Sequence, residues 1–391
     1  MRKYLSNLAV MLAGATLLAS CLSNDNNNGN NQQQVTVTKG AYIINNGNSY
    51  SGIDGSLTFL DYTGSTIKAE QGVYQRGNGA SLGNTPNDII AYGDKLYIVG
   101  SGENTIFVVD KKTLKQLPNG RVSTTALLGE AEGNSPRRLT AYNGLVYFST
   151  YGGYVAAIDT TSFSLKAKYP VGSAPEGLTF GFINNGSAIT ATLYVANSDY
   201  GNGNGSISSI NIANGSVTEI KNEKIKNPQE IAVAGDLLYV LDWGTYDDSW
   251  NQVGNGVYLV GSNNTSLVVP GATGMTAAGY VIYTFNDTYG SSDGPTFSML
   301  DIRTNAVSNL NLNAASTHRI LSPAAIAVDP NTGNLLVASR SENPDAPGTA
   351  SFTLPGYVNV YSASGTFVES FATGVEPHKI EFSYGQTTIT Y

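Results

Sequence analysis

Residues 85–99 read TPNDIIAYGDKLYIV, and the pattern of this stretch repeats along the chain. It contains a proline, two polar residues, an apolar strand, a short Gly-Asp turn and a second apolar strand. β-branched and aromatic residues on both sides of such a turn are typical of two antiparallel β-strands. The pattern recurs at residues 135–148, 174–196, 227–241 and 322–338, without its proline at 274–284, and as a first half at 376–383.

Successive prolines of this motif are 50, 39, 53, 95 and 54 residues apart, and the 95-residue step contains the copy without proline. The mean step of about 50 residues is the period of propeller blades rather than of helical solenoids. Several copies continue into a third strand that ends in aspartate, at Asp110, Asp159 and Asp301. We find no convincing amphipathic helix after residue 34. The sequence therefore predicts one all-β domain over residues 35–391, a β-propeller.

The number of units predicts seven blades. The first complete unit starts at Pro86, yet residues 41–44 and 56–61 already read as a second and a third strand. The last motif, residues 377–383, reads as a first strand with little after it. A blade shared by both termini removes the exposed edges of an open ring. We therefore predict a seven-bladed β-propeller whose last blade is closed by the N- and C-terminal strands together.

The N-terminal segment differs in composition from the repeats. Met1-Arg2-Lys3 is basic, residues 4–19 are largely apolar, and Leu18-Ala19-Ser20-Cys21 follows. The segment resembles a bacterial lipobox, which implies a signal peptide over residues 1–20 and lipidation of Cys21. An uncleaved membrane anchor is the alternative reading.

The residues after Cys21 carry sorting information and a tether. Leu22 and the Ser23-Asn24-Asp25 sequence resemble outer-membrane and surface signals, which implies an outer-membrane lipoprotein exposed at the cell surface. Residues 24–34 form an Asn/Gln run without an apolar residue. Such a run cannot bury enough apolar surface to fold, so residues 21–34 are predicted to be a lipidated, disordered tether.

Composition excludes several functions. The chain has a formal net charge of −8, so it offers no basic surface for nucleic acid. Two histidines and one cysteine exclude a multi-His or Cys-rich zinc site and an internal disulfide framework. No nucleophile elbow or paired acid–base signature stands out. We therefore assign no catalytic residue and no intrinsic cofactor.

The repeat resembles a known group of propellers. Its pattern Pro-x-x-Ile/Leu, Leu-Tyr-Val and Asp-x-x-x-Gly is similar to the YncE-like, surface-layer-type seven-bladed propellers over nearly the whole mature chain. The opening residues 40–48, with Gly55-Ser56-Leu57, resemble the lipoprotein branch that includes BtuG-type proteins. This resemblance implies capture of a cobamide such as vitamin B12 and a TonB-dependent transporter as partner. A structural or protein- or glycan-interaction propeller, and a propeller lyase or lactonase, are the alternatives.

The predicted ligand site lies at one mouth of the propeller. In antiparallel four-stranded blades, the loop before the first strand and the loop between the second and third strands emerge on the same side. The Pro-x-x residues should therefore ring one mouth of the central channel, with aromatic-rich loops around it. Aromatic rings beside amide and acid groups suit a large, partly apolar ligand that also forms hydrogen bonds, although packing between blades would also explain each aromatic residue. The predicted ligand-binding residues are Asn87, Arg137, Glu176, Gln229, Trp243, Tyr246, Trp250, Tyr289 and His378.

Acids in the loops raise the question of a metal. Ca²⁺ prefers oxygen ligands, and Gly/Asn-rich loops could present them. The candidate acids are Asp199, Asp247, Asp248, Asp287 and Asp293. None of them has a recognised calcium spacing, so calcium is possible but unsupported and no metal ligand is assigned.

Overall fold

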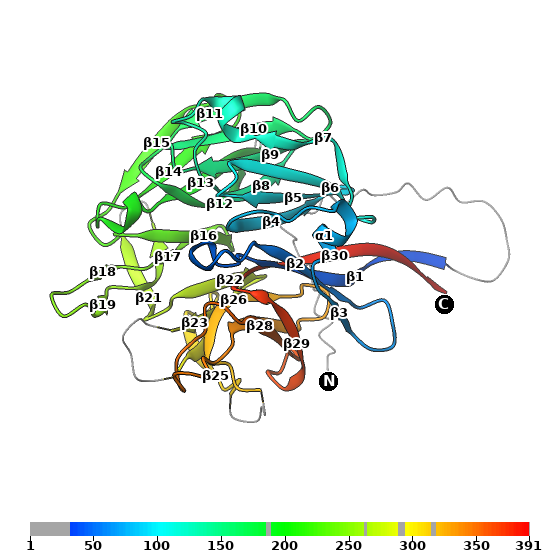
Figure 1. The fold of residues 1–391 in the computed structure, drawn as a ribbon. Coiled ribbons are helices and arrows are strands. Elements are labelled where there is room, and N and C mark those ends of the chain that lie inside the picture. The colour runs from blue at the N-terminus through cyan, green and yellow to red at the C-terminus, as the bar shows by residue number, and fades with distance from the viewer. Residues whose placement is uncertain (1–31, 185–188, 262–263, 288–293, 314–317, 391) are drawn as a thin grey trace, which may run out of the picture.

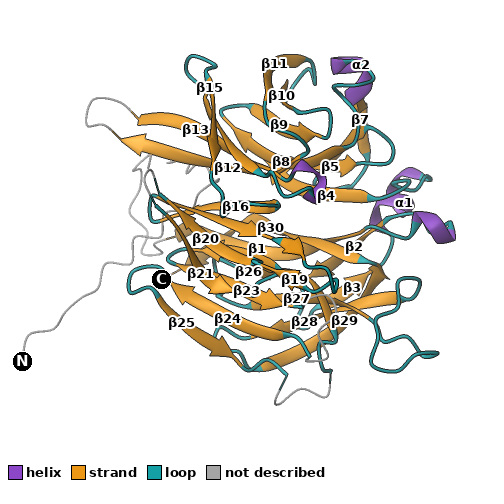
Figure 2. Ribbon diagram, turned by 90° about the vertical axis from the view of Figure 1, so that its left-hand side faces the viewer, coloured by secondary structure: helices purple, strands orange, loops and turns teal. Residues whose placement is uncertain are grey.

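The structure is a computed structural model that describes residues 32–184, 189–261, 264–287, 294–313 and 318–390. These residues form antiparallel sheets almost throughout, as Figures 1 and 2 show. In the described part of the chain, seven sheets have four strands each. A further two-stranded hairpin joins β18 (Thr245–Tyr246) to β19 (Gln252–Val253). The predicted all-β architecture is confirmed.

Corresponding strands of the seven sheets can be read in order from the repeated motif outward. The first strands are β4 (Pro86–Tyr92), β8 (Pro136–Tyr142), β12 (Pro175–Asn184), β16 (Pro228–Ala234), β22 (Gly274–Ala278), β26 (Ser322–Val328) and β30 (Pro377–Thr390). The second strands are β5 (Lys95–Gly100), β9 (Leu145–Thr150), β13 (Ile189–Asn197), β17 (Leu237–Asp242), β23 (Val281–Asn286), β27 (Leu335–Arg340) and β1 (Gln32–Asn45). The third strands are β6 (Thr105–Asp110), β10 (Tyr154–Asp159), β14 (Ser206–Asn211), β20 (Gly256–Val260), β24 (Thr296–Asp301), β28 (Pro355–Tyr361) and β2 (Ser56–Asp61). The fourth strands are β7 (Gln116–Ser123), β11 (Leu165–Pro170), β15 (Val217–Lys221), β21 (Thr265–Pro270), β25 (Ala306–Leu310), β29 (Phe367–Val375) and β3 (Lys68–Glu70).

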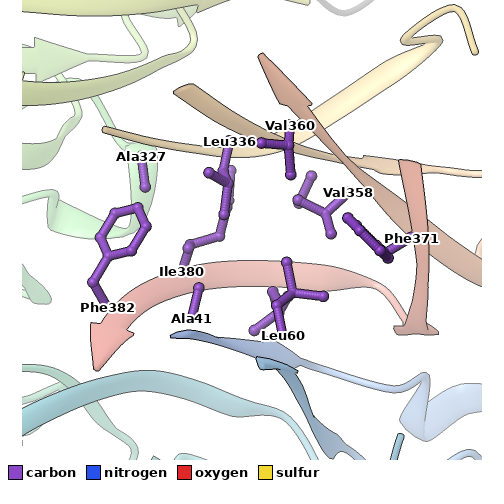
Figure 3. Close-up of a cluster of buried hydrophobic side chains, with 12 residues drawn as sticks. Ala41, Leu60, Ala327, Leu336, Val358, Val360, Phe371, Ile380 and Phe382 are labelled. Atoms are coloured by element: carbon purple, nitrogen blue, oxygen red, sulfur yellow. The ribbon is translucent and has the colours of Figure 1, made fainter. Parts of the chain in front are cut away.

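The middle strands of the sheets are buried on both faces. Tyr97, Ile98 and Val99 of β5 are fully buried, whereas the outer strand β11 alternates between half-buried and exposed residues. A strand buried on both faces needs a continuous apolar run, which is what the Leu-Tyr-Val segments supply. The buried side chains form clusters between neighbouring sheets. Figure 3 shows one of them, where Ile380 faces Leu336 and Leu60 faces Val358 of the next sheet.

The two ends of the chain lie in the same sheet. Strand β30 pairs with β1, with Ile43 opposite Ile380 and Gly40 opposite Ser383, as the sequence predicts. The pairing continues to Gln32 opposite Thr390, so β1 begins three residues before the predicted propeller boundary at Val35, within the segment predicted to be a disordered tether. In Figure 1, the dark-blue and red strands run side by side.

The first strands contact one another in chain order. β4 contacts β8, β8 contacts β12, and the series continues through β16, β22 and β26 to β30, which also contacts β4. The residues at the motif end of these strands therefore come together. No helix in the described residues is both long and apolar enough to cross a bilayer.

Two short helices that the sequence did not indicate lie beside the sheets. Helix α1 (Val73–Asn78) and helix α2 (Thr124–Leu128) are single-turn insertions beside the sheets. Both are stabilised by their ends: Gly79 takes a left-handed conformation after α1, and the Ser123 side chain accepts a hydrogen bond from Ala126 N in α2. Such short helices leave no hydrophobic periodicity to detect. Two 3₁₀ turns, η1 (Ser49–Ser51) and η2 (Asp199–Gly201), lie in loops between second and third strands.

Candidate functional site

A cavity of about 540 Å³ lies at the motif end of the first strands, which we call the mouth. Its walls come from six of the seven first strands: β8, β12, β16, β22, β26 and β30. Tyr151, Tyr200 and Trp243, from loops between second and third strands, complete the rim. The cavity thus lies where the sequence places a ligand.

A repeated backbone irregularity explains which residues reach the mouth. The register of β4 against β5 shifts between Pro86 and Asp88, and β8, β12, β16, β26 and β30 shift at the same point after their prolines. A bulge breaks the strict alternation of side chains between two faces. Both residues after the proline can therefore face the mouth, and the cavity is lined by such pairs as Arg137 with Arg138 and Gln229 with Glu230.

Arg137 belongs to a closed cluster on one side of the mouth. Its Nε donates to Glu176 Oε2 at 3.0 Å, and its guanidinium lies 4.6 Å from the centre of the Tyr151 ring. The Tyr151 hydroxyl donates to the other oxygen of Glu176, and burial with this carboxylate raises the pKa of Tyr151. Tyr200 packs edge-on against Tyr151 at 5.0 Å. Glu176 itself is buried, so its charge depends on these two partners.

Arg138 reaches across the mouth. Its Nη1 donates to the Asn87 carbonyl of β4 at 3.1 Å and lies 3.4 Å from Nε2 of His378 on β30. Its Nη2 lies 3.4 Å from Glu230 Oε1 on β16. Burial opposes the charge of Arg138, but Glu230, Asp88 and Glu176 outweigh burial and raise its pKa. One side chain therefore links four first strands at the centre of the mouth.

His378 is held in its neutral form. Burial lowers its pKa well below 6.5, and the cations Arg138, Arg137, Lys379 and Arg340 lower it further. A neutral imidazole can donate one hydrogen bond and accept another.

The mouth has two chemically different parts. The charged sector consists of the residues after the prolines of β4, β8, β12, β16 and β30: Asn87, Asp88, Arg137, Arg138, Glu176, Gln229, Glu230, His378 and Lys379. The apolar sector consists of cavity-lining residues of β22 and β26: Met275, Ala277, Ala324, Ala325, Ile326 and Ala327. One cavity is thus lined by charged and polar side chains on one side and by apolar side chains, most of them alanine, on the other.

Trp243 lies at the boundary between the two sectors. It follows β17, and its Nε1 donates to the Thr273 carbonyl just before β22 at 3.0 Å. The buried Asp242 accepts hydrogen bonds from the backbone N–H of Gly244, after the tryptophan, and from that of Asn227, just before β16, and so ties the two loops together. Gly244 has a φ of +65°, a left-handed conformation that favours glycine, and a Cβ there would meet the Val253 carbonyl oxygen.

The other predicted aromatic residues of this loop lie away from the cavity. Tyr246 and Trp250 pack against each other at 6.4 Å on the β18–β19 hairpin, which extends from the sheets at the left of Figure 1. Trp250 is 74% exposed and Tyr246 is 49% exposed. In the described part of the chain, neither lines the mouth cavity.

The predicted site residues are thus divided by the structure. The cavity is lined by Arg137, Glu176, Gln229, Trp243 and His378. Asn87 is next to it, because its Nδ2 donates to the Arg137 carbonyl at 2.8 Å and its own carbonyl accepts from Arg138. Tyr289 and the predicted lipidation site Cys21 lie outside the described residues.

Sequence reasoning missed three charged residues of the mouth: Arg138, Glu230 and Lys379. Each is the second residue after a motif proline. An ideal strand would turn this position away from the channel, and only the bulge brings it in. The sequence feature that could have revealed them is that both residues after the proline are polar in these copies of the motif: Arg137-Arg138, Gln229-Glu230 and His378-Lys379.

Three of the acids considered for calcium, Asp199, Asp247 and Asp287, accept hydrogen bonds from other groups of the protein. Asp247 accepts from Ser249 N and Asn251 N, and Asp287 accepts from the Ser322 hydroxyl. Within the described ranges, no three His, Cys, Asp or Glu side chains are grouped to hold a metal ion. Asp293 lies outside these ranges.

Comparisons with known proteins bear on the fold. A family described as a domain of unknown function (DUF5074) matches residues 39–167. No curated protein matches the chain.

Several solved structures are similar in shape. The nidogen/laminin complex matches over 89% of this chain and 98% of that chain, with 8% identity and a TM-score of 0.44. The computationally designed Ika8 protein matches over 76% and 96%, with 11% identity and a TM-score of 0.44. The WD40 repeats of RRP9 match over 74% and 81%, with 8% identity and a TM-score of 0.51. WD40 repeats form β-propellers, so this likeness, with the four-stranded sheets, shows that the chain has a β-propeller fold.

Proposed function

We propose that the protein is an outer-membrane lipoprotein, exposed at the cell surface, that captures a small-molecule nutrient in the mouth cavity and passes it to a TonB-dependent transporter. The best candidate ligand is a cobamide such as vitamin B12, which the resemblance to BtuG-type proteins implies. The observation that carries ligand binding is the mouth cavity, in which the charged sector faces the apolar sector beside Trp243.

The chemistry of the cavity suits such a ligand. A volume of about 540 Å³ is within the range of roughly 300–1,000 Å³ for small-molecule sites. A cobamide has broad apolar faces, amide side chains and a phosphate-bearing tail. Ala325 and Ala327 leave room for a flat face, while the Gln229 amide can hydrogen-bond the ligand's amides. Because a cobamide is larger than the cavity, the loops of the rim would cover the rest.

Calorimetry with cyanocobalamin tests the ligand. We expect the purified mature chain to bind, and Trp243→Ala to weaken binding by about 2 kcal/mol, as aromatic residues covered by a ligand do. Trp250→Ala is the matched control, since Trp250 is exposed on the hairpin. Absence of heat with cyanocobalamin contradicts the cobamide assignment, and a screen with haem and glycans would then identify the ligand class. Tight binding that Trp243→Ala leaves unchanged contradicts the site.

We further propose that the seven sheets are blades of a closed ring, as in YncE-like propellers. Support comes from β30, which contacts both β26 and β4, and from the buried clusters between neighbouring sheets. Deletion of residues 377–391 should therefore abolish cooperative unfolding, because it removes a first strand and opens the ring. Deletion of residues 388–391 is the control. A 377–391 deletion with the wild-type Tm contradicts closure.

The lipid anchor is proposed from the lipobox-like sequence. Cys21→Ala should release the protein from the membrane fraction, and protease treatment of intact cells should cleave the wild-type protein if it is at the surface. Unchanged fractionation of Cys21→Ala contradicts the anchor.

Interaction with a protein or glycan is the second candidate function. The exposed pair Tyr246 and Trp250 favours it, because solvated aromatic residues on a projecting hairpin are typical of contact surfaces. A pull-down with purified outer-membrane proteins, comparing wild type with Trp250→Ala, tests this candidate. Equal capture by both forms contradicts a role for the hairpin.

A further inference from the structure

We propose that Arg138 is the anchor for an anionic group of the ligand, a carboxylate or a phosphate, with Lys379 as the second cation. The inference rests on the proposed function, since the group belongs to a ligand in the mouth cavity. It assigns the anion to two residues that the sequence did not place at the site.

The distances between cations and carboxylates decide which cations are available. Among the described residues, four such ion pairs surround the mouth. In two of them the nitrogen–oxygen distance is 3.0 Å or less, and we call these closed; in the other two it is 3.4 Å or more, and we call these loose. The closed pairs are Arg137 Nε with Glu176 at 3.0 Å, and Arg340 Nε with the two oxygens of Glu376 at 2.8 and 2.9 Å. The loose pairs are Arg138 Nη2 with Glu230 at 3.4 Å, and Lys379 Nζ with Asp88 at 3.9 Å. Charge-assisted hydrogen bonds are normally about 2.7–2.9 Å long. The cations of the two loose pairs, Arg138 and Lys379, can therefore still bind another anion.

Arg138 has donors to spare. A guanidinium carries five N–H donors in a fixed plane. Among the described residues, the buried Nε of Arg138 has no hydrogen-bond partner, and the shortest hydrogen bond of its guanidinium runs from Nη1 to the neutral Asn87 carbonyl at 3.1 Å. The side chain is only 11% exposed, so its charge is poorly compensated by water. Such a group gains more from a second anion than a solvated arginine does.

The neighbours of Arg138 complete an anion site. Lys379 follows His378 on β30, and both residues line the cavity with Arg138. His378 is neutral because burial and the cations Arg138, Arg137, Lys379 and Arg340 lower its pKa. It therefore adds a hydrogen-bonding ring nitrogen without repelling the two cations. The Glu230 carboxylate would compete with a bound anion for Arg138, because it lies 3.4 Å from Arg138 Nη2.

The two histidines of the chain give a direct readout. His378 is at the mouth, whereas His318 stacks on Phe367 at 5.6 Å in another part of the structure. Imidazole NMR signals of the full mature chain would be followed during titration with sodium phosphate, with sodium acetate, and with sodium chloride at matched ionic strength. We expect phosphate or acetate to shift the His378 signal with saturation and to leave the His318 signal unchanged.

Variants separate Arg138 from its neighbours. Arg138→Gln should lower the affinity for the anion at least 10-fold, and Lys379→Gln should lower it several-fold. Glu230→Gln should raise the affinity for the anion about 5-fold, because the substitution removes the competing carboxylate. A gain of affinity cannot come from misfolding. Arg137→Gln should change affinity no more than about 2-fold. Arg303→Gln is the control, since Arg303 is exposed and paired with Asp301 outside the cavity.

Each outcome decides the inference. If only phosphate shifts the His378 signal with saturation, the site binds a phosphate group, and if only acetate does so, it binds a carboxylate. If both do so, the site accepts either anion. If neither anion shifts His378 in wild type or in Glu230→Gln, the inference is wrong. If Arg137→Gln abolishes binding and Arg138→Gln does not, it is equally wrong. Failure with cyanocobalamin alongside saturable phosphate binding overturns only the cobamide assignment, whereas the reverse result overturns only the anion site.

Discussion

The charged and apolar sectors share one backbone and differ in their side chains. Strand β16 of the charged sector and β26 of the apolar sector have the same bulge after the motif proline. The positions that follow hold Gln229 and Glu230 in β16 but two alanines in β26. The repeat therefore supplies the frame, and the two residues after each proline supply the recognition chemistry.

The two sectors also contribute differently to stability. In the charged sector, buried ionic groups are tolerated only while each keeps its partner. In the apolar sector, small side chains gain from packing and leave the cavity open. Substitutions in the charged sector should consequently cost more and depend on pH, whereas those in the apolar sector should depend on volume alone.

The largest expected effect is at Glu176. Glu176→Ala leaves Arg137 without its carboxylate and Tyr151 without its acceptor, so we expect a loss of about 3 kcal/mol in the free energy of unfolding. Ala324→Ser is the matched change one residue after the proline of β26, and it should stay within about 0.5 kcal/mol. Urea unfolding with an unchanged slope would measure both. Equal effects would remove the distinction between the sectors.

The next effect is a pH dependence at Glu381, two residues beyond Lys379 on β30. Burial raises its pKa from 4.5 to about 7, while a hydrogen bond from Ala91 N and the cation Lys379 lower it. The folded state therefore holds this proton to higher pH than the unfolded state, and stability falls as the pH rises from about 4.5 to 7.

Glu381→Gln removes this titration and keeps an acceptor for Ala91 N. The variant should be about 2 kcal/mol more stable than wild type above pH 8 and nearly equal to it at pH 4, since each pKa unit is about 1.4 kcal/mol before screening. Thermal unfolding of both proteins across this range tests the sign. A variant that loses stability at high pH together with wild type would contradict it.

In the apolar sector we expect a volume effect at Met275. This side chain is 6% exposed and packs with Tyr239 and Leu241, so Met275→Ala should cost about 2 kcal/mol, the low end for a truncation that borders an existing cavity. Met275→Leu conserves volume and should cost less than about 1.5 kcal/mol. Both costs should be the same at pH 5 and pH 8. A clear pH dependence would show that the sectors are coupled.

The features that sequence could predict are those with a local cause. Proline starts most of the first strands, and the Leu-Tyr-Val runs mark strands buried on both faces, so the all-β repeat could be read directly. The pairing of residues 41–44 with 380–383 also followed, because each half lacked the strand that the other supplied. Helices α1 and α2 could not be predicted, because one helical turn has no period.

The site was predictable only in part, because side-chain direction depends on the bulge. Arg137 and His378 were expected at the mouth, but Arg138 reaches it only through the register shift between Pro136 and Leu139. Nothing in the sequence distinguished Trp243 from Trp250, because both lie in the same loop and both were predicted to bind the ligand. The β18–β19 pairing, which no sequence pattern indicated, turns the second tryptophan outward.

The smallest expected effect compares these two tryptophans and so tests the boundary between the sectors. Trp243→Phe removes the hydrogen bond to the Thr273 carbonyl that joins the loop after β17 to the start of β22. We expect a cost of about 1 kcal/mol or less, since Trp243 is 42% exposed and water can partly replace the bond. Trp250→Phe should change stability by less than about 0.5 kcal/mol, because its ring is 74% exposed. The chain has two tryptophans, so each variant also leaves a single emitter. Acrylamide should quench the remaining Trp250 more strongly than the remaining Trp243, and a ligand in the mouth should protect Trp243 alone. Equal quenching would place both rings outside the boundary and would leave the hydrogen bond to Thr273 without a role in joining the two sectors.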